Sequence, residues 1–477
     1  MSSPPKRVLV IGGGPSGLVA LRNLTVLGKD HGIERVELVE RRDDIGGVWY
    51  LDDPTRVPEK PHWPSPAYPS LIGNVLPEFL SFNRYPFPEP PTTPHQPFPT
   101  LKETYDYLRG FAEPYIKSGQ IRLGHEVVSV EELPDNAGWN VKFKDWSNGW
   151  DGVERDEVWN AVVVAVGWYD NPVWPNTPGL SELIEKGLAR HAKSWRGPVG
   201  LAGKRALIIG NANSSNDIAA HLAPVAQRPV YRSVRHTAFP GFPSLPDERI
   251  EDVAPVQSYD LDTTTNKVTA HLENGTIIKD IDQVIVGTGY RPYPSFIHVR
   301  TEGQLAPLMN GTISPHRIPS VHRHILYALN TSLAFIGSFM AYTPFTVNDI
   351  ASSWLALVWT GEIAIPDTLE ARLVFEKERL EAIEEGRKEW AEKMIKAGEH
   401  DNRAMPTSFL QYSVLAASEE GYAGGLREEV VKARPEWGGT YVEWNEERRV
   451  WRERMFPMKF AALKWARENK IKGGTEI

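Results

Sequence analysis

Apolar runs of strand length alternate with helical patterns in the first part of the chain. Residues 7–11 form one apolar run, a helical pattern follows and stops at Gly28, and residues 36–40 form a second run. A strand, a helix and a strand in this order are typical of a βαβ unit with parallel, buried strands. The same pattern starts again at residues 205–209 and ends near Val230 and Tyr231. The sequence therefore predicts an α/β fold built on two such units.

Shorter elements follow from the same reading. We expect further strands over residues 121–130, 139–143, 161–166, 268–272, 277–278, 284–286 and 333–336, and helices over residues 104–115 and 347–359. The turn Glu273-Asn274-Gly275 predicts a hairpin. Leu369, Leu373, Leu380 and Ile383 mark a charged amphipathic helix, and the polar residues after it are expected to wrap the core. Thr346 to Asp349 fits a capping box, and His322 and His324 are expected at the surface.

Residues 49–99 are rich in proline and aromatic side chains, with seven prolines between Pro86 and Pro99. The interleaved Phe and Tyr side chains favour burial, so we interpret this stretch as an ordered loop that wraps a surface. A flexible excursion is the alternative.

Composition narrows the classes of function. The 477 residues correspond to about three domains. The net charge of −8 gives no basic excess for nucleic acid or an anionic membrane. The absence of cysteine excludes disulfides, thiolate metal sites, cysteine nucleophiles and dithiol redox chemistry. No apolar run approaches the ~20 residues that span a bilayer, and glycines interrupt the N-terminal run, which makes it a poor signal peptide. We expect a cytoplasmic protein.

The first glycine-rich motif is Gly12-Gly13-Gly14-Pro15-Ser16-Gly17, which fits GxGxxG between a strand and a helix. Its glycines allow a tight turn and a close approach to a pyrophosphate, which then faces the helix N-terminus. Glu40 ends the next strand, where a carboxylate can accept both hydroxyls of an adenosine ribose and repels a 2′-phosphate. This motif predicts a site for FAD or NAD, against the alternative of an empty turn.

The second motif runs from Gly210 through Asn211, Ala212, Asn213 and Ser214 to Ser215, with Ala and Ser in place of the second and third glycines. The strand after it ends in arginines, Arg232 and Arg235, rather than in an acid. Arginines there would bind a 2′-phosphate through charge-assisted hydrogen bonds, which predicts an NADPH site. Surface cations are the alternative reading. An FAD site and an NADPH site in one chain imply hydride transfer to a flavin.

Several segments match motifs of one enzyme family. Gly46-Gly47-Val48-Trp49 matches GGxW, and the segment from Tyr68 to Asn74, followed by Phe79 to Pro88, resembles YxxLxxNxPxxxMxFxxFPF. Residues 165–168 and 287–290 resemble two ATGx turns, and Gly187, His191 and Trp195 resemble the fingerprint FxGxxxHxxxY/F. From Val8 to about Gly361 the chain thus resembles the class B flavin-dependent monooxygenases, specifically the flavin-containing monooxygenase (FMO) family.

Two positions depart from the family pattern. Glu185 stands where the fingerprint has Phe, and Trp195 stands where this family has Tyr or Phe. Baeyer–Villiger monooxygenases have Trp at that position, but their fingerprint continues with Pro or Asp, whereas Arg196 follows here. The fingerprint supports the class without deciding the reaction.

The resemblance implies two Rossmann-like domains, with the NADPH domain inserted in the FAD domain. Residues 1–170 would form the first part of the FAD domain, 171–289 the NADPH domain, and 290–477 the second FAD part with a helical C-terminal wrap. It also implies an FAD- and NADPH-dependent monooxygenase. Such an enzyme inserts one oxygen atom of O2 into a nitrogen or sulfur nucleophile through a flavin 4a-hydroperoxide. Specialised metabolism is the expected setting.

Two alternatives stay open: a Baeyer–Villiger monooxygenase acting on ketones, and an NADPH oxidase or redox sensor without a dedicated substrate. The expected partners are a small-molecule substrate and O2, with neither nucleic acid nor membrane, and a homodimer is left open. By resemblance Asn74 is the expected catalytic residue and lies beside the flavin, with a plain turn former as the alternative. The expected cofactor-binding residues are Gly12, Gly14, Pro15, Ser16, Gly17, Glu40, Arg41, Gly47, Val48, Trp49, Asn74, Val127, Gly210, Asn211, Asn213, Ser214, Ser215, Arg232 and Arg235.

Overall fold

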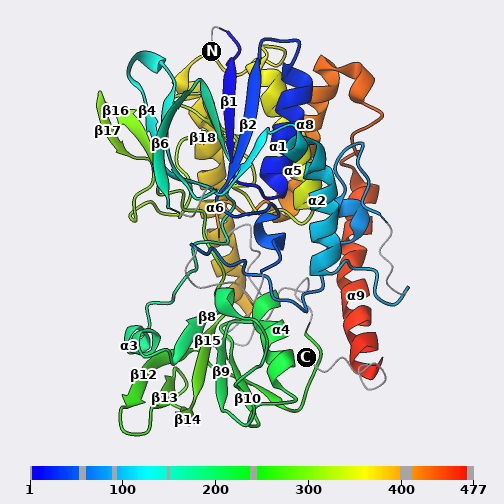
Figure 1. The fold of residues 1–477 in the computed structure, drawn as a ribbon. Coiled ribbons are helices and arrows are strands. Elements are labelled where there is room, and N and C mark those ends of the chain that lie inside the picture. Colours follow the sequence, from blue (N-terminus) through cyan, green and yellow to red (C-terminus); the bar gives the residue numbers. More distant parts are fainter. Residues whose placement is uncertain are drawn as a thin grey trace.

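The computed structural model describes residues 3–52, 61–88, 94–147, 151–236, 244–397 and 411–469. Figure 1 shows two groups of strands, one at each end of the molecule, with helices packed on each group and long helices running between them.

The larger group is centred on a seven-stranded sheet of order β18-β19-β20-β7-β1-β2-β3. Its strands come from both halves of the chain: β1 (Arg7–Ile11), β2 (Arg35–Glu40), β3 (Ile121–Leu123), β7 (Ala161–Val164), β18 (Val321–His322), β19 (Leu326–Tyr327) and β20 (Leu333–Phe335). The central strand β1 pairs in parallel with β2 and β7, and Val8, Leu9 and Val10 are completely buried. The predicted βαβ unit is thus present, and residues 8–11 of β1 are apolar, as a strand buried on both faces requires.

Three helices pack beside this sheet (Figure 1): α1 (Pro15–Gly28), α2 (Leu101–Lys117) and α5 (Pro344–Trp359). α1 and α5 lie against each other and share one hydrophobic core with the sheet, although more than 300 residues separate them in sequence. The N-terminal and C-terminal parts of the chain therefore complete one unit.

The smaller group is centred on a parallel sheet of order β11-β10-β9-β15-β8. Its strands all lie within residues 189–286: β8 (Ala189–His191), β9 (Ala206–Ile209), β10 (Val230–Ser233), β11 (Ile250–Val253) and β15 (Gln283–Val286). The helices α3 (Leu180–Glu185) and α4 (Asn213–Leu222) accompany it. The predicted second βαβ unit is β9, α4 and β10.

Two further sheets, one antiparallel and one mixed, contain the remaining strands. One contains β12 (Val256–Asp262), β13 (Lys267–Leu272) and β14 (Ile277–Ile281), so the predicted hairpin around Gly275 is confirmed. The other has the order β17-β16-β4-β5-β6 and contains β4 (His125–Glu132), β5 (Trp139–Asp145), β6 (Val153–Trp159), β16 (Ile297–Thr301) and β17 (Gln304–Pro307).

The chain enters and leaves the smaller group at one place. The amide of Val173 donates to the carbonyl of Gly289 (2.9 Å), and the amide of Arg291 donates to the carbonyl of Asn171 (3.0 Å). Pro172 and Tyr290 form an antiparallel bridge between these bonds. The outgoing and returning segments therefore run as a short paired ribbon.

The C-terminal part is helical: α6 (Leu369–Ala397), α8 (Glu419–Ala433) and α9 (Glu446–Asn469). The predicted amphipathic helix is confirmed as α6. In Figure 1, α9 extends from the level of the larger sheet down to the level of α4. At its far end Arg467 Nη1 donates to the carbonyl of Pro246 (2.6 Å), so this helix contacts both groups.

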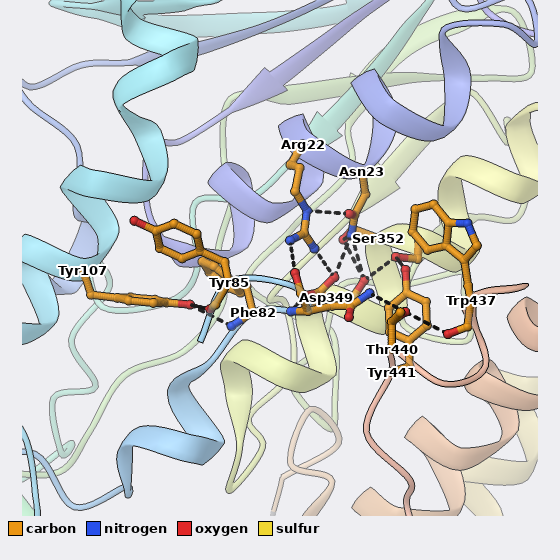
Figure 2. Close-up of polar contacts among 12 residues, drawn as sticks. Arg22, Asn23, Phe82, Tyr85, Tyr107, Asp349, Ser352, Trp437, Thr440 and Tyr441 are labelled. Carbon is orange, nitrogen blue, oxygen red and sulfur yellow. Dashed lines mark hydrogen bonds and ion pairs between the residues drawn. The ribbon is translucent and has the colours of Figure 1, made fainter. Parts of the chain in front are cut away.

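The predicted capping box at Thr346–Asp349 is wrong. α5 begins at Pro344, not at Val347, so Asp349 lies inside the helix and is 2% exposed. Its carboxylate accepts hydrogen bonds from Arg22 and Asn23 of α1 and from the backbone amide of Asn83 (Figure 2). A buried carboxylate is stable only with such partners, and α1 supplies them.

The expected surface position of two histidines is also wrong. His322 is 7% exposed and His324 is 4% exposed. His324 lies among the rings of Phe339, Phe375 and Tyr412, with ring centroids 5.0–6.0 Å away. Burial lowers the pKa of His324 to about 3, so the ring is neutral at neutral pH.

Candidate active site

The first glycine-rich turn joins β1 to α1 and is too tight for side chains. Gly12 has a φ of +110°, and a Cβ there would lie 2.8 Å from the carbonyl oxygen of Ala165. A Cβ on Gly17 would overlap the carbonyl oxygen of Gly12. α1 starts with Pro15 and has no side-chain N-cap, so its first amides are free of a capping side chain. Such a helix end favours an anion, and the turn fits the pyrophosphate of a dinucleotide.

A second helix N-terminus meets the first at this turn. α5 starts with Pro344 and also has no side-chain N-cap. Asn348 of α5 is 4% exposed, and its Nδ2 donates to Ser16 Oγ (2.9 Å). Two positive helix ends near one another favour negative charge between them. We did not single out Asn348 from the sequence, because no local pattern connects it with Ser16, 332 residues away.

Glu40 lies directly beside the first turn. It is 5% exposed, and its Oε2 accepts a hydrogen bond from the amide of Gly13 (2.7 Å). Its Oε1 accepts from the amide of Arg42 (3.0 Å). The carboxylate is thus fixed where β2 ends, at the position from which an acid reaches a ribose in dinucleotide folds. The ribose contact itself stays a prediction.

The segment around Gly47 closes over the same turn. The amide of Gly46 donates to the carbonyl of Gly13 (2.8 Å). Gly47 has a φ of +58°, and a Cβ there would lie 2.7 Å from Gly14 Cα. Gly47, Val48 and Trp49 form a single 3-10 turn beside it. The structure therefore brings the GGxW segment and the GxGxxG turn together, although 34 positions separate their first glycines, Gly12 and Gly46.

Arg41 directly follows β2, and Val127 lies on β4. Arg41 forms an ion pair with Asp170, which also pairs with Lys193 at 3.0 Å. Burial alone would raise the pKa of Asp170, but the two cations outweigh it and hold that pKa below its ordinary value. Val127 is half-buried in β4, opposite Phe143. Arg41 thus already has a protein partner, and a cofactor contact by either residue stays a prediction.

The second glycine-rich turn shows why serine replaces the third glycine. Gly210 has a φ of +108°, and a Cβ there would lie 2.8 Å from the carbonyl oxygen of Gly287. Ser215 Oγ donates to the carbonyls of Gly287 (3.2 Å) and Ile209 (3.3 Å), so its side chain ties β9 and β15 to the helix. A serine that makes these bonds takes over the close packing that a third glycine usually provides.

The polar residues of this turn surround the start of α4. Asn213 and Ser214 are the first two residues of the helix, and α4 has no side-chain N-cap. Asn211 Nδ2 donates to the carbonyl of His236 (2.6 Å), which links the turn to the chain beyond β10. The amides at the helix start have no capping side chain, which fits a second pyrophosphate.

The two arginines after this unit differ in their environment. Arg232 donates to both carboxylate oxygens of Asp252 (2.6 and 2.9 Å) and to Asn216 (2.7 Å), so its guanidinium is already engaged. Arg235 is exposed and forms no ion pair within the described ranges of the chain. The sequence did not distinguish them. Of the two, Arg235 is the one whose donors are available to a 2′-phosphate.

Asn74 lies in a bend of the loop between β2 and α2. It is exposed, and its side chain makes no hydrogen bond to the described part of the protein. The backbone before it is held firmly, since the amide of Gly73 donates to the carbonyl of Pro99 (2.8 Å). The position of Asn74 relative to a flavin stays a prediction.

Aromatic side chains gather where the chain crosses between the two groups of strands. The rings of Tyr169 and Tyr290 are 5.3 Å apart, and His191 lies 5.1 Å from Tyr290 and 5.5 Å from Trp174. Tyr169 is 41% exposed, so this aromatic group reaches the protein surface. Burial lowers the pKa of His191 to about 4, so its imidazole is neutral at neutral pH. It packs against the neighbouring aromatic rings.

Trp195 belongs to the core of the smaller group rather than to this crossing. It is 1% exposed and stacks on His221 of α4, with centroids 6.2 Å apart. Ala206, Ile208 and Ile218 complete its core cluster. Trp195 is the fingerprint residue that matches the Baeyer–Villiger monooxygenases. In this structure its side chain packs in the core.

The described ranges contain no group of three or more His, Asp or Glu side chains that is placed to hold a metal ion. No helix in them is long and apolar enough to cross a membrane.

Comparison with known proteins agrees with this architecture. The family model described as flavin-binding monooxygenase-like matches residues 5–239. Flavin-containing monooxygenase FMO GS-OX-like 2 of Arabidopsis thaliana is 30% identical over 378 residues, which cover 76% of this chain and 75% of that protein. The thiol-specific monooxygenase of Saccharomyces cerevisiae is 27% identical over 372 residues, which cover 77% of this chain and 80% of that protein.

Among solved structures, the S-allyl-L-cysteine S-oxygenase from Allium sativum superposes with a TM-score of 0.65. It is 25% identical in sequence, and the match covers 95% of this chain and 98% of the other. The fold is thus that of two dinucleotide-binding domains, one inserted in the other, and the cofactors are FAD and NADPH. With two uncapped, glycine-rich helix starts and a relative at 30% identity over three quarters of its length, the chain belongs to the flavin-containing monooxygenase family.

Proposed function

We propose that this monooxygenase oxygenates a nitrogen or sulfur nucleophile of a small organic molecule in specialised metabolism, and that sulfur is preferred. In this reaction one atom of O2 goes to the substrate and the other leaves as water. NADPH supplies the two electrons. The carrying observation is the similarity along nearly the whole chain to an S-oxygenase of S-allyl-L-cysteine, joined by a thiol-specific relative.

The two glycine-rich turns are the proposed cofactor cradles. Bound FAD would supply the oxygen chemistry, and the chain's own work is to hold the two dinucleotides and exclude water. The turn at Gly12–Gly17, with Glu40 and the Gly47 segment, is proposed for FAD, and the turn at Gly210–Ser215 for NADPH. We propose residues 1–170 and 290–477 as the FAD domain and residues 171–289 as the NADPH domain.

Asn74 is proposed as the residue that faces the reacting centre. An exposed amide without a protein partner, carried on a backbone that is itself fixed, can orient a polar group of a cofactor or substrate. What supports this role is the lack of any hydrogen bond from its side chain to the described residues and the resemblance of the segment from Tyr68 to Asn74.

The reaction class is tested with a substrate panel at matched concentration. NADPH consumption, peroxide release and product mass are measured with S-allyl-L-cysteine, a simple thiol, a tertiary amine and a cyclic ketone. We expect sulfoxide formed in proportion to NADPH with the thioether, and weaker turnover with the amine. Ester formed from the ketone while the others only release peroxide would make the enzyme a Baeyer–Villiger monooxygenase. Peroxide release with every compound would make it an oxidase.

Asn74 is tested by Asn74→Ala with Ser70→Ala as the control, since Ser70 is exposed in the same loop. We expect Asn74→Ala to be reduced by NADPH at the wild-type rate but to release most of its electrons as peroxide. Unchanged coupling between NADPH and product would return Asn74 to the role of a turn residue.

A further inference from the structure

The C-terminal helix α9 inserts one ammonium group beside the loop that carries Asn74. Lys459 Nζ donates to the carbonyl of Gly73 (2.7 Å) and to that of Ile72 (3.3 Å). It also lies 5.1 Å from the centroid of the Phe98 ring. Burial lowers the pKa of Lys459, so placing its charge here has a cost that the two carbonyls and the ring offset. These specific contacts distinguish Lys459 from a lysine that is simply solvated at the surface.

These bonds complete the fixation of the backbone before Asn74. On the other side, the amide of Gly73 is bound by the carbonyl of Pro99, and Ile72 forms a bridge with Thr100. Lys459 donates to the carbonyls of Ile72 and Gly73, which do not take part in this bridge. Because the Asn74 side chain has no partner of its own in the described protein, only its backbone sets its direction.

The Lys459 ammonium also interacts with the smaller group of strands and helices. Asp217 of α4 attracts the charge of Lys459 electrostatically. The carboxylate of Asp217 accepts a hydrogen bond from the hydroxyl of Tyr68, six residues before Asn74. α4 begins at the turn proposed for NADPH, so Lys459 lies where the loop, α9 and the NADPH-side helix meet. Six residues further towards the end of α9, Trp465 stacks on His95, with centroids 5.6 Å apart.

We propose that Lys459 is a positioning residue that fixes the backbone of Asn74 and makes its placement depend on the position of α4. This inference rests on the proposed role of Asn74. It predicts that α9, which lies outside both glycine-rich turns, controls how efficiently NADPH electrons reach the product.

The test replaces Lys459 by Met, which keeps the stem but removes the charge and the donors. We expect unchanged FAD content and an unchanged rate of flavin reduction by NADPH, together with a severalfold rise in peroxide released per NADPH consumed. Lys459→Arg should restore most of the coupling. Lys464→Met is the matched control, because Lys464 is exposed on the same helix. Wild-type coupling in Lys459→Met would overturn the proposal.

Two further measurements separate this inference from the proposed function. In an Asn74→Ala background, Lys459→Met should add no further uncoupling, and a full additional effect would show that it does not act through Asn74. Backbone hydrogen exchange of residues 72–75 should speed up in Lys459→Met and not in Lys464→Met. If Asn74→Ala leaves coupling unchanged, the proposed role of Asn74 fails, while the exchange measurement still decides whether Lys459 fixes this loop. Unchanged exchange would overturn the positioning role.

Discussion

Arg22 of α1 donates to the Asp349 carboxylate of α5 over 2.6 Å, in a contact where both side chains are largely withdrawn from water (Figure 2). Arg22 also donates to the backbone carbonyl of Asn83 (2.5 Å). Asn83 lies in the segment of residues 49–99 that is rich in proline and aromatic side chains. A neighbouring link runs from Ser353 to the hydroxyl of Tyr441 (2.7 Å) in the C-terminal part. Three distant segments are therefore held to α5 by one buried polar cluster.

Asp349→Asn should destabilise the FAD domain strongly. The variant keeps the shape but leaves the Arg22 charge without its counter-ion, and breaking a buried pair typically costs about 3–5 kcal/mol. The free energy of unfolding in urea measures this loss. Ser353→Ala is the control, because it removes a neutral hydroxyl and should cost about 1 kcal/mol. Equal effects of the two changes would contradict the importance that we give to the ion pair.

Gly47→Ala should lose FAD while the NADPH domain stays folded. The new methyl group would lie 2.7 Å from Gly14 Cα, and a φ of +58° is itself unfavourable for alanine. Since Gly14 Cα is a backbone atom and the alanine methyl group has no rotamer to change, no side-chain movement relieves the contact. Flavin absorbance per protein measures the effect. Gly311→Ala, where nothing lies within 4 Å of the new Cβ, should keep its full flavin content.

Arg235→Ala should erode the preference for NADPH over NADH. Loss of a charge-assisted contact to phosphate typically costs about 1.5–3 kcal/mol, so the Kd for NADPH should rise roughly ten- to a hundredfold while that for NADH hardly changes. Arg232→Ala should instead lower the unfolding temperature, because its partners are Asp252 and Asn216. A wild-type enzyme that uses both coenzymes equally would make both arginines structural or surface cations.

Acidification should unfold the protein partly through His324. Its pKa is about 3 in the fold, against an ordinary value near 6.5, so the unfolded chain binds a proton that the folded chain does not. The contribution of His324 to the free energy of unfolding is therefore fully present above about pH 6.5. It is lost as the pH drops towards 3, and the loss is about 2 kcal/mol at pH 5. Thermal unfolding of wild type and His324→Phe between pH 7 and 5 measures this contribution. Parallel curves for the two proteins would contradict it.

The sequence predicted the features that local chemistry determines. Glycines at fixed spacing between a strand and a helix predict a tight turn, and both turns are present at Gly12 and Gly210. Apolar runs predicted β1, β7 and β9, because strands buried on both faces consist mainly of apolar residues, and β2 was predicted although it carries Glu37 and Glu40. The hairpin at Gly275 followed from its turn residues.

The sequence did not predict the contacts between distant segments. The spacing from Thr346 to Asp349 imitates a capping box, yet Asp349 bonds to Arg22, and no local pattern indicates a partner 327 residues away. The sequence pattern places His322 and His324 as alternate residues of a surface strand or loop, whereas the aromatic side chains of Phe375, Tyr412 and Tyr422 pack around His324. The contacts of Lys459 with Ile72 and Gly73 also join distant segments, so no local pattern indicates them.

The paired ribbon of residues 171–173 and 289–291 has a consequence for engineering. Because the outgoing and returning strands are hydrogen-bonded to each other, the two ends of the intervening segment lie side by side. A graft at this place joins two neighbouring chain ends and leaves the larger sheet uncut. We therefore expect that the segment between them can be exchanged between relatives as a cassette, provided that the incoming α4 presents an acid where Asp217 meets Tyr68.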